Sequence, residues 1–552
     1  MRKAFIAALV GLTVAAAPAS AQPSSRTAFV VIVRGVSMPQ LLQAPEIRSL
    51  AAAGGVALMN GRDDARRGLR SLADGLDDPA RLSVADVQRV EGVTELLDET
   101  SLVMGPPVLV MIVAVSPSAA SAANGDDLGT VIAAWGNPDE LLEARGEPHA
   151  LTSDSTRRAG AVADVDPAAT VARWLDLPND AGAPMRPTDE PAPLDLYERY
   201  LQQRRLAVPV AAGAWGLMLV FGLVGCLALA FRERVPLRTL ALAGALAGSL
   251  PWLALGLLLV GHLPSLTYVS VGPFLLAVMG AGVAFTRWVA ASRGILVALA
   301  ACGAVILVVL GIEAALGWPA AVTPLAGGGQ LDGGRFFGMP NIEIGMVLGS
   351  AMFIAHRIRV GNGVLLLAAC ALVAGSPWTG ANFGAAITLF AAAGMWLAIR
   401  RRRPWWVVAL ITGTITAVGM AAIAAMHRYL ADRPTHVTTF LEDTTSLTGV
   451  VDRMVGRLGI GFDQLTETPF TLVPVVGTLV LLVVVLRPPA GTARSFEGHD
   501  AWRDAVLVLL LGSVVAYLAN DTGAAALGFG FGFTLSGLID VSLASARRMM
   551  AR

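Results

Sequence analysis

Residues 294–317 read GILVALAACGAVILVVLGIEAALG, an apolar run whose one charged side chain is Glu313. A helix needs about 20 such residues to cross the hydrocarbon core of a bilayer. Similar runs recur after residue 207, so the sequence predicts an all-α polytopic membrane domain of about 11 transmembrane helices. The predicted spans are 208–231, 239–261, 267–286, 294–317, 341–356, 362–376, 380–399, 404–426, 470–486, 504–519 and 523–545. The short runs at 341–356 and 362–376 also fit one re-entrant hairpin.

Composition divides the chain into two parts. Of the 552 residues 55% are hydrophobic and 15% charged, which excludes both an ordinary soluble protein and a disordered chain. Residues 22–205 hold 17 basic and 26 acidic residues, whereas 206–552 hold 22 basic and 15 acidic ones. An acidic soluble domain therefore precedes a basic membrane domain. The soluble part has no basic stripe, so we expect no nucleic-acid partner.

The N-terminus predicts the orientation. Residues 1–21 have the pattern of a signal peptide, with Arg2 and Lys3, an apolar core and the sequence Ala19-Ser20-Ala21. If the next domain lies outside, 17 of the 22 basic residues in 206–552 fall in connections on the cytoplasmic side, as the positive-inside rule requires. We expect a multi-pass plasma-membrane protein with an extracytoplasmic N-terminal domain and a cytoplasmic C-terminus.

The soluble part shows alternating strand and helix patterns. Strands are predicted at 28–33, 56–59, 108–115 and 130–134, with a proline-led helix at 45–53. This alternation is typical of an α/β sheet with covering helices, here over residues 22–180. Residues 181–194 are rich in Pro, Ala and acidic side chains, and a helix is expected at 194–205. The segment 181–205 is therefore interpreted as a linker and a helix that leads into the membrane.

Two segments of this domain carry a resemblance. Residues 29–37 (FVVIVRGVS) and 44–54 (APEIRSLAAAG) resemble the opening of the alkaline phosphatase/sulfatase superfamily, and residues 151–160 (LTSDSTRRAG) with 164–171 resemble its closing segment. The resemblance implies a truncated phosphatase-like sheet. The domain followed by many spans is similar to a group of actinobacterial-type membrane proteins that has no established activity.

The chain departs from that family where the chemistry would lie. The family's first metal-binding aspartate falls near Arg34, which cannot bind a cation, and the domain has one histidine, His149. Ser71 lies roughly where a nucleophile is expected, but it also fits an ordinary helix or turn serine. Two divalent ions activate such nucleophiles, so the resemblance implies a pseudoenzyme domain without metal or cofactor.

Polar residues gather in the connections predicted to lie outside. They occur in 332–343 (DGGRFFGMPNIE), 376–384 (SPWTGANFG) and 520–523 (NDTG). Charged groups at membrane depth are usually paired or line an aqueous cavity. We therefore predict that Arg335, Glu343, Asn382, His436 and Asp521 converge on one outward-facing cavity, in which Arg335 pairs with Glu343. The alternative is a set of solvated turns. The candidate substrate-binding residues are Asp332, Arg335, Asn341, Glu343, Asn382, Arg433, His436, Asn520 and Asp521.

A long external segment, 427–468, precedes the ninth span. Apolar residues at helical spacing predict an amphipathic helix on the outer membrane surface. Just before it lie His427, Arg428, Arg433 and His436, a cluster that suits a phosphate or pyrophosphate headgroup.

Three functions fit these patterns. The first is a non-catalytic role in cell-envelope assembly or in lipid or glycan handling. The second is a lipid-linked glycan ligase or polymerase, with His436 as the base and Arg433 and Arg335 holding the phosphate. The third is a transporter. The expected partners are membrane lipid, and either a polyprenyl-phosphate-linked glycan or an envelope protein. A different glycosyltransferase class is disfavoured because the first external loop, 262–266, holds His262 and no acid.

Overall fold

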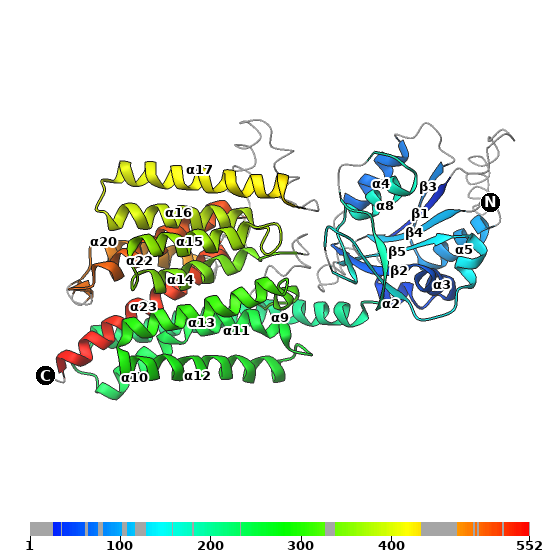
Figure 1. Cartoon of the computed structure of the whole chain (residues 1–552). Coiled ribbons are helices and arrows are strands. Elements are labelled where there is room, and N and C mark those ends of the chain that lie inside the picture. The colour runs from blue at the N-terminus through cyan, green and yellow to red at the C-terminus, as the bar shows by residue number, and fades with distance from the viewer. Residues whose placement is uncertain are drawn as a thin grey trace. The chain divides into compact units, whose positions relative to one another are not determined.

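The chain folds into two compact units, which are described separately (Figure 1). One unit comprises residues 1–205 with 331–337, and the other 206–330 with 338–552. The structure is a computed structural model. It describes residues 26–34, 36–60, 64–74, 81–101, 107–115, 128–156, 158–178, 182–231, 233–325, 337–431, 472–489, 492–493, 496–520 and 524–550.

The first unit is a mixed α/β domain built on one sheet in the strand order β3-β1-β4-β5-β2-β6-β8, with β7 beside β2. β1 runs parallel to β3 and β4, whereas β5 is antiparallel to both of its neighbours, β4 and β2. The strands are β1 (Thr27–Arg34), β2 (Gly55–Asn60), β3 (Leu82–Val87), β4 (Val108–Val115), β5 (Leu128–Gly136), β6 (His149–Thr152), β7 (Ala161–Val162) and β8 (Arg186–Pro191).

Helices cover this sheet. Every residue of β4 is buried, as its uninterrupted apolar sequence requires of a strand covered on both faces. α4 (Asp64–Asp74) contacts α8 (Asp166–Trp174), while α3 (Pro45–Ala53) contacts α5 (Val90–Ser101) and α7 (Pro138–Glu143). A short helix, α2 (Met38–Leu41), follows β1. The predicted α/β class is therefore confirmed.

One segment of this unit differs from the prediction. Residues 186–191, interpreted from their Pro and acid content as linker, form β8, which pairs antiparallel with β6. Five of the six β8 residues are exposed, so the strand lies at the sheet edge with a hydrophilic sequence. An edge strand tolerates proline and charge, and hydrophobic periodicity cannot detect it.

The second unit is helical and apolar. Among the described residues, eight helices are long and apolar enough to cross a membrane, and three shorter apolar ones accompany them. The helices are α9 (Leu194–Ala230), α10 (Leu237–Gly248), α11 (Leu250–Leu259), α12 (Tyr268–Arg293), α13 (Ile295–Ala315), α14 (Ile344–Ala355), α15 (Val360–Gly375), α16 (Phe383–Arg400), α17 (Trp405–Tyr429), α20 (Leu472–Leu486), α22 (Asp500–Ala519) and α23 (Ala524–Met550). Short 3₁₀ turns are η2 (Val260–His262), η3 (Pro319–Val322) and η4 (Asn341–Glu343).

These helices correspond closely to the eleven predicted spans. α10, α11 and η2 together make one span of 26 residues, interrupted at Ser249 before Pro251. α14 and α15 are the two runs predicted to be short, and they form separate helices. α9 differs from the prediction, because it continues without a break through both the predicted leading helix and the first span.

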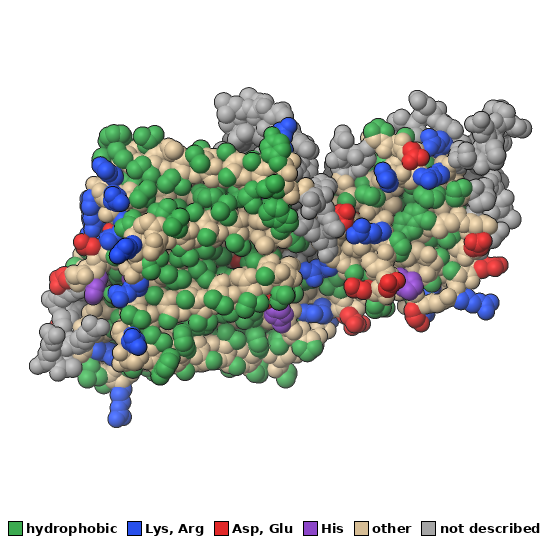
Figure 2. Space-filling view, viewed as in Figure 1, with side chains coloured by type: hydrophobic (Ala, Val, Ile, Leu, Met, Phe, Trp, Pro, Cys, Tyr) green, Lys and Arg blue, Asp and Glu red, His purple; other side chains and the backbone are tan. Residues whose placement is uncertain are grey.

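The surface of this unit is that of a membrane-embedded protein. Apolar side chains cover its flank, while arginine side chains gather at the end where α23 finishes (Figure 2). Trp288 and Trp406, near the arginines that end α12 and α16, are 70% and 71% exposed. Exposed aromatic rings of this kind occur where a protein meets the boundary between lipid and water.

Candidate functional site

At one end of the helical unit the chain leaves regular helix, and hydrogen bonds join the connections to one another. The Leu325 amide donates to the Leu257 carbonyl at 3.2 Å. The Trp318 indole donates to the Thr379 carbonyl at 2.6 Å, and the Met339 amide donates to the Gly380 carbonyl at 2.8 Å. We call this region the polar end; it comprises η2, the end of α13, η3, residues 338–343 and 376–382, and Asn520. Irregular backbone is tolerated at membrane depth only inside protein or beside water.

Asn382 organises the centre of the polar end. Its side-chain oxygen accepts a hydrogen bond from the Ala385 amide and so caps the N-terminus of α16. Its side-chain nitrogen donates to the Met339 carbonyl at 2.9 Å and to Oδ1 of Asn341 at 2.7 Å. The sequence named Asn341 and Asn382 as separate candidate residues, and the structure joins their side chains directly. Asn382 uses its hydrogen-bonding groups within the protein, so its role is to hold the connections together.

The backbone here adopts unusual conformations. Trp318 and Ala381 have positive φ angles of 60° and 45°, which are uncommon for residues with a side chain. Gly338 has φ +98°, and a Cβ at this position would overlap the Gly380 carbonyl oxygen. Such conformations cost free energy and persist where surrounding contacts enforce them, often at functional sites.

Glu343 lies in η4, two residues after Asn341. The side chain is fully buried, and neither carboxylate oxygen has a hydrogen-bond partner within the part of the chain that is described. It does not face lipid. The predicted partner Arg335 lies outside the described residues, so that pairing stays a prediction.

A second buried acid, Glu313, lies near Glu343 at the end of α13. Glu313 is 3% exposed and acts electrostatically on Glu343. Its Oε1 lies 2.5 Å from Nε2 of His262, and its Oε2 accepts a hydrogen bond from the Ala320 amide at 3.0 Å. The His262 side chain is 46% exposed, so this pair connects a buried acid to the protein surface.

Sequence reasoning missed the pair of His262 and Glu313. It noted that the first external loop held a histidine and no acid, and it placed Glu313 near the outer end of a span without giving it a partner. The available signal was an acid inside an apolar run, since such a group needs a nearby partner. The two residues are 51 positions apart, and only the packing of α11 and η2 beside η3 brings them together.

Asn520 also reaches the polar end. Its side-chain nitrogen donates to the Ala516 carbonyl at 2.9 Å, and a Cβ on Gly384 would overlap its Oδ1. The glycine thus allows the end of α22 to approach the first turn of α16. Asn341, Glu343, Asn382 and Asn520 are the candidate residues that the structure describes. Asp332, Arg335, Arg433, His436 and Asp521, with most of the amphipathic segment 427–468, lie outside the described residues.

His427 is buried at the end of α17, where its Nε2 lies 2.8 Å from the Gly375 carbonyl oxygen. The sequence grouped this histidine with Arg428 as a headgroup-binding cluster. Its burial and its contact with α15 give it a structural role instead. Arg428 lies on the exposed face of the same helix, against the ring of Tyr429.

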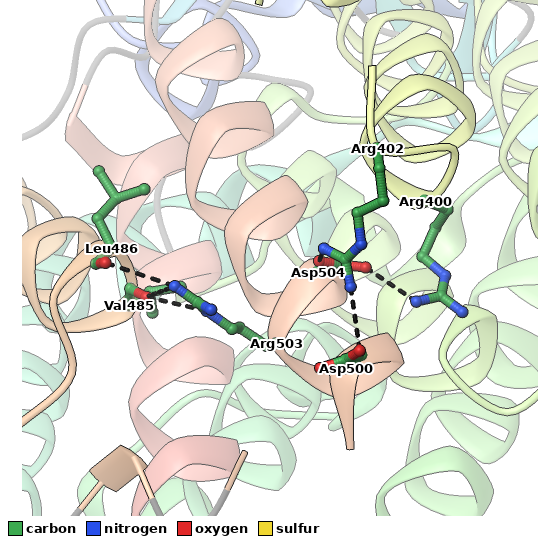
Figure 3. A network of polar contacts seen from close by, with 7 residues as sticks. All are labelled: Arg400, Arg402, Val485, Leu486, Asp500, Arg503 and Asp504. Atoms are coloured by element: carbon green, nitrogen blue, oxygen red, sulfur yellow. Dashed lines mark hydrogen bonds and ion pairs between the residues drawn. The ribbon is translucent and has the colours of Figure 1, made fainter. Parts of the chain in front are cut away.

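At the opposite ends of these helices, buried acids are paired with arginines; we call this region the arginine end. Arg400 and Arg402 donate to the two oxygens of Asp504 at 2.9 and 3.1 Å, which ties α16 to α22 (Figure 3). Arg402 also reaches Asp500, and Arg503 donates to the Val485 carbonyl at the end of α20. A further set of contacts pairs Asp540 of α23 with Arg287 of α12 at 2.8 Å.

In the α/β unit, Asp166 is a fully buried acid. Its carboxylate accepts hydrogen bonds from the hydroxyls of Ser153 and Ser155 and from the amides of Ala163 and Ala183, at 2.5–2.9 Å. Burial raises the pKa of Asp166, and these four hydrogen bonds act against that rise. These hydrogen bonds connect three loops. They occupy the carboxylate oxygens of Asp166, which therefore are not available to bind a ligand.

The residues that the family resemblance singled out are dispersed. Arg34 is exposed at the end of β1, Ser71 is exposed within α4, and His149 is exposed at the start of β6. Among the described residues, no group of three or more His, Cys, Asp or Glu side chains is placed to hold a metal ion. Comparisons with protein-family models, with curated proteins and with solved structures found no match to this chain.

Proposed function

We propose that this chain is a multi-pass plasma-membrane protein that handles a lipid or a lipid-linked glycan of the cell envelope at its polar end. The supporting observation is the concentration of Glu343, Glu313, His262 and Asn341 at one end of an apolar helical unit. Acids and amides suit the hydroxyl groups of a glycan. The phosphate of such a lipid would be bound by Arg335, Arg433 and His436.

The direct test identifies what the protein carries. The full chain, extracted in a mild detergent, is analysed for copurifying lipid by mass spectrometry. A polyprenyl-phosphate or glycolipid species, reduced in His262→Gln and Glu343→Gln, supports the proposal. Asp500→Ala is the matched control, because Asp500 is exposed and lies at the arginine end. Recovery of bulk phospholipid alone, unchanged in all variants, contradicts it.

We propose a non-catalytic role for the α/β unit. Two observations support this: Arg34 stands where the resemblance expects a metal ligand, and the buried Asp166 is committed to four internal hydrogen bonds. The full chain should show no stoichiometric divalent metal by elemental analysis and no phosphodiesterase turnover. Bound zinc at one ion per chain, or turnover abolished by Ser71→Ala, would overturn this role.

The proposed orientation places the α/β unit outside and the C-terminus in the cytoplasm. Its support is the distribution of arginines, which occupy the ends of α12, α16 and α23 at the arginine end. A reporter that is active only in the cytoplasm should give signal when fused after Arg552 and none when inserted at Asp443. The reverse pattern would refute the orientation.

A further inference from the structure

The starting observation is the isolation of the Glu343 carboxyl. It is 0% exposed, and neither oxygen accepts a hydrogen bond from any described residue. An ionised carboxylate without a partner in such surroundings costs several kcal/mol, whereas a neutral carboxylic acid costs far less. The nearby acid Glu313 adds repulsion to any charge placed on Glu343. The site therefore favours the protonated form.

The surroundings of Glu343 contain little else that titrates. η4 packs against α14 and α23. α14 has no titratable side chain, and the charged residues of α23 are Asp540, Arg547 and Arg548, at the arginine end. Among the described residues, Glu313 is the group that acts electrostatically on Glu343.

Glu313 and His262 form a hydrogen-bonded pair close to Glu343. Glu313 hydrogen bonds through Oε1 to Nε2 of His262, at 2.5 Å. The His262 side chain is half-exposed. His262 and Glu313 are in direct contact, and the fully buried Glu343 lies near Glu313.

We propose that Glu343 is a proton-binding site and that Glu313 and His262 relay protons between it and the surface. Series of Asp, Glu and His residues at membrane depth are typical of proton pathways in pumps and transporters. A proton suits this site better than a metal ion, because one proton neutralises the buried acid without further ligands. The proposal is independent of any lipid or glycan at the polar end, since it concerns the protein's own carboxyl groups.

The first experiment maps protonated buried carboxyls with dicyclohexylcarbodiimide on the full chain in detergent. The acid proton moves to a carbodiimide nitrogen, the carboxylate oxygen bonds to the central carbon, and rearrangement leaves an N-acylurea that mass spectrometry locates. We expect an adduct on Glu343 whose yield falls several-fold from mildly acidic to mildly alkaline buffer. Asp504 is the matched control, a buried acid that forms ion pairs with Arg400 and Arg402, and it should stay unmodified.

The second experiment tests the relay by infrared difference spectroscopy in D₂O. A carboxylic acid band that is absent in Glu343→Gln should exchange its proton several-fold more slowly in His262→Gln and in Glu313→Gln. If both variants exchanged the proton at the wild-type rate, the proposed relay through Glu313 and His262 would be contradicted. If the carbodiimide left Glu343 unmodified, the proposed proton-binding site would be overturned. The carbodiimide experiment uses only the wild-type chain, so it remains decisive even if Glu343→Gln does not accumulate.

Discussion

The two ends of the helical unit differ in whether their buried acids have ion-pair partners. At the arginine end, Asp504 and Asp540 each form ion pairs with arginines, and these pairs join helices that are distant in sequence. At the polar end, Glu343 has no hydrogen-bond partner among the described residues, and Glu313 is held by a histidine and a backbone amide. At the arginine end each buried acid is thus compensated by an arginine, whereas no described residue compensates Glu343.

This difference separates structural from functional candidates. A buried ion pair is costly to break, because the remaining partner keeps a charge without compensation. An acid without a hydrogen-bond or ion-pair partner adds little to the free energy of unfolding. Its place in the interior is therefore better explained by a functional role. The variants below test this distinction from the largest expected effect on stability to the smallest.

The largest loss should follow from Asp540→Ala. This change leaves the Arg287 guanidinium beside Gly244 and Gly248 without its partner, at a cost of about 3–5 kcal/mol. We expect a clear drop in Tm of the detergent-solubilised protein, measured by tryptophan fluorescence.

The double variant Arg287→Ala/Asp540→Ala should recover most of that loss, because it leaves no unpaired charge. Asp500→Ala, which removes an exposed partner of Arg402, should have little effect. A double variant as unstable as Asp540→Ala would show that the loss does not come from an uncompensated Arg287 charge.

A smaller loss is expected in the α/β unit from Asp166→Asn. Whichever way the amide is oriented, its NH₂ group faces one of the donating backbone amides of Ala163 and Ala183, which costs roughly 2–3 kcal/mol. Hydrogen exchange of the amides in β6 and α8 should accelerate. Asp154→Asn is the control, because Asp154 forms a partly exposed ion pair with Arg186. Equal exchange in the two variants would contradict a structural role for Asp166.

Gly338→Ala tests the backbone of the polar end. The added Cβ would overlap the Gly380 carbonyl oxygen, and φ +98° disfavours a side chain, so we expect a loss of about 1–3 kcal/mol. Gly361→Ala is the matched control, since a Cβ at that glycine meets no atom within 4 Å and has room. A Tm that falls only in Gly338→Ala, together with loss of copurifying lipid, would link this backbone to the site.

The smallest stability effect should come from Glu343→Gln. The substitution keeps the shape of a neutral carboxyl and removes no hydrogen bond seen in the structure, so stability should change by about 1 kcal/mol or less. The matched control variant at the arginine end is Asp540→Asn. It removes the charge of an acid that is ion-paired with Arg287, so it should lower Tm much more. If the two variants were equally unstable, Glu343 would have a structural partner and the contrast between the ends would fail.

Parts of this architecture could be predicted because they follow from local patterns. Apolar runs of sufficient length predicted the apolar helices, and the two runs predicted to be short, 341–356 and 362–376, contain the short helices α14 and α15. The buried strands β1 and β4 were found from uninterrupted apolar sequence. β8 was taken for linker, because a hydrophilic edge strand is defined by its pairing with β6 and not by its composition.

The candidate site was predicted only in part. Asn341, Glu343 and Asn382 were recognised as polar residues near span ends, which the order of the spans places on one side. Their individual roles could not be predicted. Asn382 is a helix cap bound to Asn341, and His427 is buried against Gly375, because each has a hydrogen-bond partner at least 41 positions away in sequence.

The sequence by itself determined that this chain has an α/β unit and an apolar helical unit, since hydrophobic periodicity and run length are local properties. The tertiary structure decided which buried acids are paired. Asp540 meets Arg287 and Glu313 meets His262 only through helix packing, while Glu343 is left without a partner among the described residues. Hydrogen bonds and ion pairs act over a few ångströms, so their partners are set by how the helices pack together.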